Sequence, residues 1–489
     1  MKNTSNAYKA IILSLFSSLL LILSFPRADL GFLAWVGLLP LFFAIRGKSP
    51  IFSFLISYLC GFLFFLGTIY WLIHVTLLGW IVLCLYLALY FGLFGFLFSR
   101  FSKLPKILFF FFIPCAWTLL EYLRAHLLTG FGWALLGYSQ YKFLPIIQIA
   151  DIAGAYGISF LVIMVNLAIY LRLRERKESR AEIMICSFLI ILTFTYGFFR
   201  LNQKPGVERI KISVIQGNIP QEWKWEEGKK DFNLEKYLFL AKLAALENPD
   251  LIIWPETAFP GYLWQEPELF AKVLKLTREI KIPLLVGLVT SDGASIYNSA
   301  ILISKDGEPA QIYNKLHLVP FGEYIPLRKV LPFLETIVPI GDFTAGKEYT
   351  VFKTPAPFST LICFEDTVAE LSCQFTKRGA EFLTNITNDA WFKDTAAPYQ
   401  HLQASVMRAV ENRRPLIRAA NTGVSAFIAA NGEIVDRVQQ SGKDTFVDGI
   451  LSSEITTGNE LTFYTRFGDI FIVFCCLVVL AGIFKKKNS

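Results

Sequence analysis

The sequence has few charged residues and very few histidines. Only 18% of its 489 residues are Asp, Glu, Lys or Arg, whereas soluble domains usually carry about 25%. Hydrophobic residues make up 54% of the chain, a balance that excludes an ordinary soluble protein. There are four histidines and eight cysteines, and no Cys/His pair in the sequence has the spacing of zinc ligands. We therefore expect a membrane protein that uses no metal ion and no other cofactor.

The hydrophobic residues are concentrated in two parts of the chain. Residues 1–200 hold most of them, residues 205–460 have a globular composition, and residues 466–484 are apolar again. We expect a membrane domain of seven helices over 1–200, a globular domain over 205–460 and a final transmembrane helix over 466–484. Each expected helix is near the ~17–25 residues that cross the hydrocarbon core. The eight predicted helices cover roughly 8–25, 30–45, 51–74, 77–98, 107–123, 152–171, 182–199 and 466–484.

Lysine and arginine residues gather in alternate connections between these helices. One set of short connections carries only Arg27, Arg124 and Lys142. The other set carries fifteen: Lys2, Lys9, Arg46, Lys48, Arg100, Lys103, Lys106, Arg172, Arg174, Arg176, Lys177, Arg180, Lys485, Lys486 and Lys487. Basic connections stay in the cytoplasm, so we expect both termini there and residues 205–460 outside. The net charge of +8 is then a sign of topology, and we expect no nucleic-acid partner.

Residues 205–460 alternate between strand-like and helix-like stretches. Such a mixture predicts an α/β layered sandwich. The strand-like stretches include 211–216, 251–254, 283–290, 297–303, 359–363 and 381–386, and the helix-like stretches include 229–247, 266–281, 367–377 and 398–413.

A long connection from Glu323 to Tyr349 has no clear periodicity and is rich in apolar residues. Loops of this length are usually functional or disordered, and this one is too apolar for disorder. It is either a lid that dips into the membrane interface or a loop packed on its own domain.

A cysteine, a lysine and two glutamates stand at the ends of strand-like stretches. Cys363 and Glu365 follow one such run, Glu256 ends another, and Lys315 follows a predicted hairpin. Backbone N–H groups near the end of a strand, together with a cation, favour a thiolate. Lys315 and the N–H of Phe364 could stabilise an oxyanion, Glu256 could act as a general base and Glu365 could orient the site. These are the parts of a covalent acyl-transfer site.

Glu323 lies eight residues after Lys315 and is a candidate second acid beside it. Taken singly, a cysteine after a strand is usually a packing residue, and a lone lysine or glutamate is usually a solvated charge. The hypothesis depends on several such residues in strings that match one family.

These strings resemble the nitrilase superfamily of Glu-Lys-Cys enzymes and, within it, the bacterial apolipoprotein N-acyltransferase family. The layout, with a catalytic domain before the last transmembrane helix, is similar as well. The matching strings lie at 216–221, 254–257, 313–315, 318–324, 363–365, 388–391 and 418–423.

The resemblance implies a nitrilase-like αββα sandwich on the periplasmic side of the bacterial inner membrane. Its implied reaction has two steps. Cys363 takes an acyl chain from a phospholipid, typically phosphatidylethanolamine, as a thioester. The α-amino group of an apolipoprotein's diacylglyceryl-cysteine then takes the chain as an amide. Glu256 is implied to be the base and Lys315 the oxyanion partner.

Other site residues follow from the same match. Glu323 and Glu365 are implied to be supporting acids, and Trp225, Asn314 and Trp391 substrate-binding residues. Phe364 departs from the family, because many members carry tyrosine directly after the nucleophile.

Two other functions fit parts of the sequence. A membrane-anchored amidase of the nitrilase type would hydrolyse its thioester, which needs a wet site without an apolar lid. A transporter or receptor would need functional charges within its spans, yet the predicted spans are nearly free of them.

Overall fold

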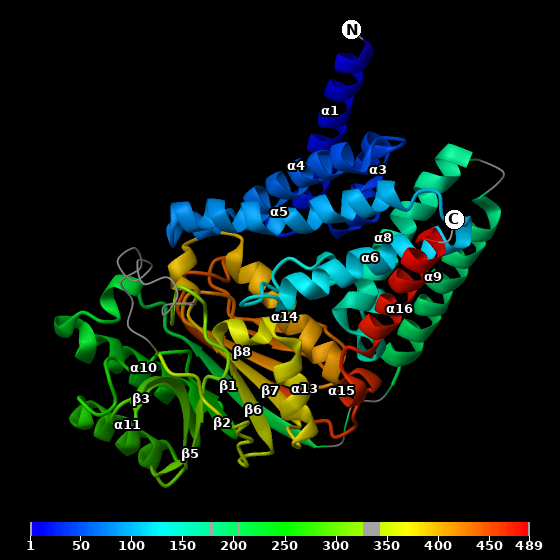
Figure 1. The fold of residues 1–489 in the computed structure, drawn as a ribbon. Coiled ribbons are helices and arrows are strands. Elements are labelled where there is room, and N and C mark those ends of the chain that lie inside the picture. Colours follow the sequence, from blue (N-terminus) through cyan, green and yellow to red (C-terminus); the bar gives the residue numbers. More distant parts are fainter. Residues whose placement is uncertain (1, 176–178, 204–205, 207, 326–342, 488–489) are drawn as a thin grey trace. The chain divides into compact units, whose positions relative to one another are not determined.

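The computed structural model describes residues 2–175, 179–203, 206, 208–325 and 343–487 (Figure 1). The middle of the long apolar connection, 326–342, for which the sequence left a lid and a packed loop open, lies outside these residues. The chain forms two compact units, each described here by itself. The first comprises Met1–Gln203, Thr395–Gln403 and Phe467–Ser489, and the second Lys204–Asp394 and Ala404–Arg466.

The first unit is helical. Its α-helices are α1 (Lys2–Leu23), α2 (Ala34–Gly37), α3 (Leu39–Ile45), α4 (Pro50–Thr68), α5 (Leu77–Arg100), α6 (Lys106–His126), α7 (Leu144–Ile147), α8 (Ala150–Glu175), α9 (Arg180–Leu201) and α16 (Ile470–Lys487). Short 3₁₀ turns lie at η1 (Gly31–Leu33), η2 (Tyr70–His74) and η3 (Leu136–Gln140). Helices α4 and α5 pack along each other, and Gly95 leaves no room for a Cβ against Ser53 and Ser57. Small residues allow this close approach where the surrounding lipid is as apolar as the helices.

Five helices among the described residues are long and apolar enough to cross a membrane: α4, α5, α6, α8 and α9. The expected count of eight is therefore not confirmed. The helix predicted over 30–45 corresponds to a short apolar helical stretch, Gly31–Ile45, in which η1, α2 and α3 follow one another. Pro40 stands at the start of α3, where its missing N–H costs nothing. Hydropathy averages over such a stretch and does not detect its division into these elements.

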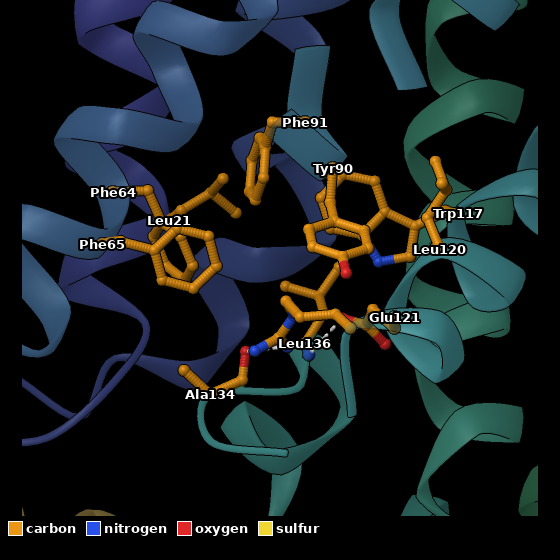
Figure 2. A pocket seen from close by; sticks show the side chains of 11 residues that line it. Leu21, Phe64, Phe65, Tyr90, Phe91, Trp117, Leu120, Glu121, Ala134 and Leu136 are labelled. Carbon is orange, nitrogen blue, oxygen red and sulfur yellow. Dashed lines mark hydrogen bonds between the residues drawn. The ribbon is translucent and has the colours of Figure 1, made fainter. Parts of the chain in front are cut away.

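Two charged residues of α6 are buried in the first unit. Arg124 donates to the carbonyl oxygens of Phe131 and Trp133, at 2.9 and 2.7 Å. The carboxylate of Glu121 accepts from the N–H of Leu136 at 2.8 Å. Both charges thus bond irregular backbone that would otherwise be unsatisfied in an apolar environment. Figure 2 shows the small, mainly apolar and aromatic cavity beside them.

The first unit also contains the start of α14 (Ala397–Asn412). The amide oxygen of Gln400 accepts from the indole N–H groups of Trp71 and Trp133, at 3.0 and 2.7 Å. Its amide nitrogen donates to the carbonyl oxygen of Thr68 at 2.8 Å. This buried amide fixes the first turn of α14 against η2 and the residues after α6.

The second unit contains two sheets. The first has the order β11-β1-β2-β3-β4-β5 and the second the order β10-β9-β8-β7-β6. Strands β1, β2 and β3 run parallel, as do β6, β7 and β8, and the outer strands pair antiparallel. The strands are β1 (Arg209–Gln216), β2 (Leu251–Ile253), β3 (Leu284–Ser291), β4 (Ile296–Ile303), β5 (Pro309–Asn314), β6 (Phe358–Ile362), β7 (Phe382–Thr387), β8 (Leu416–Ala420), β9 (Ala426–Ile428), β10 (Ile434–Arg437) and β11 (Gly449–Thr456).

Helices cover the outer faces of the two sheets. On the first sheet, α10 (Lys230–Ala245) and α11 (Pro267–Ile280) bury Leu234, Tyr237 and Val273 against strand residues such as Ile252 and Val286. On the second, α13 (Ala369–Lys377) packs against β6, while β1 lies near β8 and β4 near β6 across the interior (Figure 1). The unit is therefore a four-layer α/β sandwich, as the sequence predicts. The carboxyl ends of its parallel strands are where a site is expected in such folds.

Candidate active site

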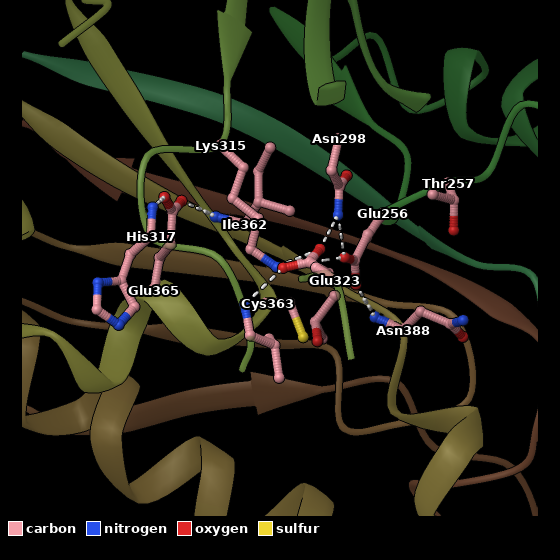
Figure 3. A network of polar contacts seen from close by, with 12 residues as sticks. Glu256, Thr257, Asn298, Lys315, His317, Glu323, Ile362, Cys363, Glu365 and Asn388 are labelled. Atoms are coloured by element: carbon pink, nitrogen blue, oxygen red, sulfur yellow. Dashed lines mark hydrogen bonds and ion pairs between the residues drawn. The ribbon is translucent and has the colours of Figure 1, made fainter. Parts of the chain in front are cut away.

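Three strand ends bring the predicted nucleophile, lysine and base together. Glu256 follows β2, Lys315 follows β5 directly, and Cys363 is the first residue after β6. Figure 3 shows their side chains converging on one point, with Glu323 among them. The order along the chain is that of the sequence prediction. Glu256 and Cys363 lie where the chain leaves buried strands, and Lys315 lies where it leaves the largely exposed edge strand β5.

The carboxylate of Glu256 is held on both oxygens. Oε1 accepts from Nδ2 of Asn298 at 2.7 Å, and Oε2 accepts from the backbone N–H of Asn388 at 2.8 Å. Nζ of Lys315 lies 3.9 Å from Oε1. These donors orient the carboxylate for the general-base role that the sequence predicts.

Lys315 bonds a different carboxylate more closely. Its Nζ lies 2.9 Å from Oε1 of Glu323, and the Lys315 side chain is only 1% exposed. Oε2 of Glu323 accepts from the N–H of Val319 at 2.8 Å. Burial alone would lower the pKa of Lys315, but the Glu323 carboxylate, with a further contribution from that of Glu256, raises it above its usual value. Lys315 is therefore a permanent cation at the site, suited to an oxyanion.

Cys363 opens the 3₁₀ turn η7 (Cys363–Thr367) with a φ of 54°. A left-handed conformation at a residue other than glycine is strained and is typical of functional positions. Nδ2 of Asn385 donates to the carbonyl oxygen of Cys363 at 3.0 Å and helps to hold it there.

The charge state of Cys363 differs from the sequence expectation of a thiolate. Burial raises the pKa of its thiol well above the usual value, the Glu256 carboxylate raises it further, and Lys315 lowers it. Loss of solvation outweighs the cation, whose nearest partner is Glu323. The resting group is a neutral thiol, so its attack requires a base.

Glu365 is fully buried and accepts hydrogen bonds from several backbone and side-chain donors. The N–H groups of Leu316 and His317 donate to Oε1 at 2.7 and 3.0 Å, and that of Ile362 donates to Oε2 at 2.7 Å. The hydroxyl of Tyr313 donates to both oxygens. Burial raises the pKa of Glu365 to about 7, against the lowering effect of Lys315 and these donors. Glu365 thus bonds the backbone directly after Lys315 and the backbone directly before Cys363 through one carboxyl group.

The remaining predicted residues lie around this centre without a shown role. Trp225 and Trp391 are exposed, at 43% and 54%, and their substrate contacts stay predictions. Asn314 accepts from the hydroxyl of Ser299 at 2.7 Å, within the sheet. The ring of Phe364 stacks on His317, with 6.0 Å between centroids. The described residues contain no group of three or more His, Cys, Asp and Glu that could hold a metal ion.

Two residues of the site were not predicted from the sequence. Asn298, in β4, donates to both Glu256 and Glu323, and Lys224 is buried beside Glu256. The polar pair Asn298-Ser299 within an apolar strand could have indicated Asn298 as a site residue. Nothing in the sequence indicates Lys224, because it stands between two tryptophans in a polar segment.

Comparison with known proteins agrees with this geometry. Residues 17–168 match the model of the apolipoprotein N-acyltransferase N-terminal domain, and residues 211–457 match that of carbon-nitrogen hydrolases. The apolipoprotein N-acyltransferase of Geobacter metallireducens is 38% identical, over 98% of this chain and 96% of the relative. That of Haemophilus ducreyi is 32% identical, over 85% of this chain and 82% of the relative.

The chain belongs to the apolipoprotein N-acyltransferase family. The family resemblance seen in the sequence is thereby confirmed. Solved structures also match about half of the chain. A carbon-nitrogen hydrolase from Helicobacter pylori is 19% identical over 51% of this chain and 89% of that one, with a TM-score of 0.40. Nit3 of Saccharomyces cerevisiae, a nitrilase-superfamily member, is 19% identical over 52% of this chain and 92% of that one, with a TM-score of 0.39.

Proposed function

We propose that this chain transfers an acyl chain from a phospholipid to the α-amino group of the N-terminal diacylglyceryl-cysteine of apolipoproteins, through a thioester on Cys363. The observation that carries the proposal is the convergence of Glu256, Lys315 and Cys363 at strand ends (Figure 3), in a member of the apolipoprotein N-acyltransferase family. The proposed reaction is the N-acylation step of lipoprotein maturation.

In the first step, Glu256 takes the proton of the Cys363 thiol while the sulfur attacks the ester carbonyl. The oxyanion forms beside the ammonium of Lys315 and the N–H of Phe364. When the C–O bond breaks, the leaving alkoxide takes the proton from Glu256. The products are an acyl-thioester on Cys363 and a lysophospholipid. The neutral resting thiol and the oriented carboxylate of Glu256 suit this proton transfer.

In the second step, the neutral α-amino group attacks the thioester carbonyl. Glu256 takes a proton from the nitrogen, the C–S bond breaks, and the Cys363 sulfur receives the proton back from Glu256. A thioester keeps most of the acylating power of the ester, so no further energy source is needed. An amine outcompetes water where the site is dry.

The amidase alternative has less support. It shares the Glu-Lys-Cys chemistry, but it leaves the apolar helices and the match of residues 17–168 without a function. A transporter leaves the whole Glu256–Lys315–Cys363 geometry unexplained.

We also propose the location. The catalytic unit lies on the periplasmic side of the bacterial cytoplasmic membrane, and both termini lie in the cytoplasm. The distribution of lysine and arginine supports this orientation. Single cysteines introduced at exposed Lys347 and Lys103, in a chain with Cys363→Ala, test it. A membrane-impermeant maleimide applied to intact cells should label Lys347→Cys and leave Lys103→Cys unlabelled until the cells are opened.

The decisive experiment incubates the detergent-solubilised chain with a phospholipid labelled in its sn-1 acyl chain. The protein should acquire label that hydroxylamine removes, and a synthetic diacylglyceryl-cysteine peptide should then remove the label as an amide. Cys363→Ala should stay unlabelled. Label on Cys363→Ala would disprove the thioester, and release of label by water at the same rate without the peptide would support the amidase.

A further inference from the structure

Lys224 is a second buried lysine beside the site. It follows the 3₁₀ turn η5 (Gln221–Trp223) and is only 5% exposed. Its Nζ donates to the carbonyl oxygen of Glu256 at 3.0 Å and to Oγ1 of Thr257 at 2.9 Å. Taking an ammonium group out of water is costly, so a buried lysine in a site calls for a specific reason.

The turn that Lys224 bonds is strained. Thr257 has a φ of 45°, a conformation that is costly for a β-branched residue. On its other side the turn is pressed against β3, because a Cβ on Gly287 would meet the backbone of Pro255 and Glu256. The N–H of Phe259 donates to the carbonyl oxygen of Gly287 at 3.1 Å. The backbone of Glu256 is therefore clamped between β3 and the ammonium of Lys224.

These contacts divide the positioning of Glu256 between two sets of groups. Asn298 and Asn388 hold its carboxylate, whereas Lys224 holds the backbone from which that side chain extends. The same ammonium also brings positive charge near Glu256 and Cys363. Burial lowers the pKa of Lys224 to about 7, while the nearby carboxylate of Glu256 favours its protonated form.

We propose that Lys224 is a positioning residue for acyl transfer: its ammonium bonds the strained Glu256–Thr257 turn and fixes the base at the distance from Cys363 that proton transfer needs. The role rests on the proposed function only in that Glu256 is the base. It is independent of which acyl donor enters, because Lys224 acts on the base.

The test compares the acylation of Cys363 in Lys224→Met, Lys224→Arg and Thr257→Val with the parent chain. Lys224→Met keeps much of the side-chain length but loses both hydrogen bonds. A displaced catalytic group costs about 100-fold in rate, so we expect a loss of that order in the single-turnover acylation rate with an unchanged KM for the donor. Lys224→Arg, which can still donate to both oxygens, should recover part of the rate. Thr257→Val loses one hydrogen bond and should lower the rate roughly three- to tenfold.

The matched control is Lys242→Met, at an exposed lysine of α10 whose nearest acidic oxygen, on Glu279, is 3.8 Å away. It should keep the parent rate. If Lys224 has a purely structural role, the acylation rate of each Lys224 variant should fall in proportion to the loss of thermal stability. Lys224→Arg should then recover none of the rate. That result, or a Lys224→Met rate within twofold of the parent, would overturn the proposal.

Two further measurements apply if Lys224→Met does not fold or if the chain does not accept a phospholipid. If Lys224→Met does not fold, Thr257→Val decides, because it is nearly isosteric: a parental rate in Thr257→Val overturns the proposal. Each variant is also acylated with a p-nitrophenyl ester, which is not a phospholipid. If the parent accepts this ester but no phospholipid, the proposed function fails while the role of Lys224 is still tested by the same ratio of rates.

Discussion

The ammonium of Lys315 bonds Glu323 more closely than it bonds the expected base: Nζ lies 2.9 Å from Glu323 and 3.9 Å from Glu256. The two carboxylates therefore have different tasks. Glu323 neutralises and fixes the buried lysine, and Glu256 keeps a carboxylate that can take a proton. Asn298 separates them, since its Nδ2 donates to Oε1 of each, at 2.7 Å to Glu256 and 2.9 Å to Glu323.

Replacing Glu323 by glutamine should impair both stability and rate. The new amide group would oppose either the ammonium of Lys315 or the N–H of Val319, and the lysine would lose its nearest counter-charge. Leaving a buried charge without its partner is strongly destabilising, and a shifted Lys315 should lower the acylation rate by about 100-fold. Glu308→Gln, at an exposed glutamate, is the control and should behave as the parent chain. A parental acylation rate in Glu323→Gln would show that Lys315 needs no such partner.

Replacing Asn298 by aspartate should slow the acylation of Cys363 more than replacing it by alanine. Asn298→Ala removes two donors, whereas Asn298→Asp places a third carboxyl group against Glu256 and Glu323. Close carboxylates cannot all ionise, so a shared proton on Glu256 would deprive the site of its base. We expect Asn298→Asp to acylate Cys363 more slowly than Asn298→Ala at neutral pH and to regain part of its rate as the pH rises. Asn248→Asp, on the surface, should show neither effect, and equal rates in the two Asn298 variants would contradict the argument.

The position of the triad could be predicted because Glu256 and Cys363 follow strands of buried apolar residues and Lys315 follows a hairpin. Strands such as Leu251–Ile253 and Phe358–Ile362 are recognisable as apolar runs, and their ends in a layered sandwich meet at one edge. The family strings then assigned roles to Glu256, Lys315 and Cys363. The division into helical and globular parts followed from the distribution of hydrophobic residues, and the α/β class followed from the alternation of strand-like and helix-like stretches.

The contacts of Lys224 and Asn298 were beyond sequence reasoning for a physical reason. Lys224 meets Glu256 from 32 positions away, and Asn298 meets it from 42 positions away, so both contacts exist only after the layers have packed. Desolvation of Cys363 depends on the same packing, which is why a thiolate was expected where burial favours a thiol. In the first unit, hydropathy could not detect that the helical stretch 31–45 is divided at Leu38, between α2 and α3. It also counted Arg124 among the connections, whereas the structure buries it against backbone carbonyl groups.

Glu365 should matter for folding more than for chemistry. In Glu365→Gln, one oxygen of the carboxylate becomes an N–H group that faces the donors from Leu316 and His317 or from Ile362. Each unsatisfied buried donor costs about 1–3 kcal/mol, so the thermal unfolding midpoint, followed by tryptophan fluorescence, should fall clearly. Activity per folded molecule should fall as well, because Lys315 and Cys363 lose their link. Glu433→Gln, at a glutamate of the surface hairpin, should leave the midpoint unchanged, and an unchanged midpoint in Glu365→Gln would contradict the role given to this carboxylate.

The thiol of Cys363 should react slowly with iodoacetamide at neutral pH. The thiolate is the reacting form, and its fraction is small because the pKa of Cys363 is raised well above its usual value. From about pH 7 to about pH 9 the rate should therefore rise about tenfold per pH unit without a plateau. Mass spectrometry of the peptide that contains Cys363 measures this rate, with Cys363→Ala to identify the background. A plateau below about pH 8 would show that the thiolate is already formed at rest.

Glu256→Gln separates reactivity of the thiol from catalysis. The Glu256 carboxylate raises the pKa of Cys363, so its removal should lower that pKa and increase the alkylation rate at a given pH. The same substitution removes the proposed base, so acylation by phospholipid should fall by about 100- to 10,000-fold. The two measurements on one variant must therefore move in opposite directions. If alkylation and acylation fall together, Glu256 acts by holding the site in shape, and its role as the base is wrong.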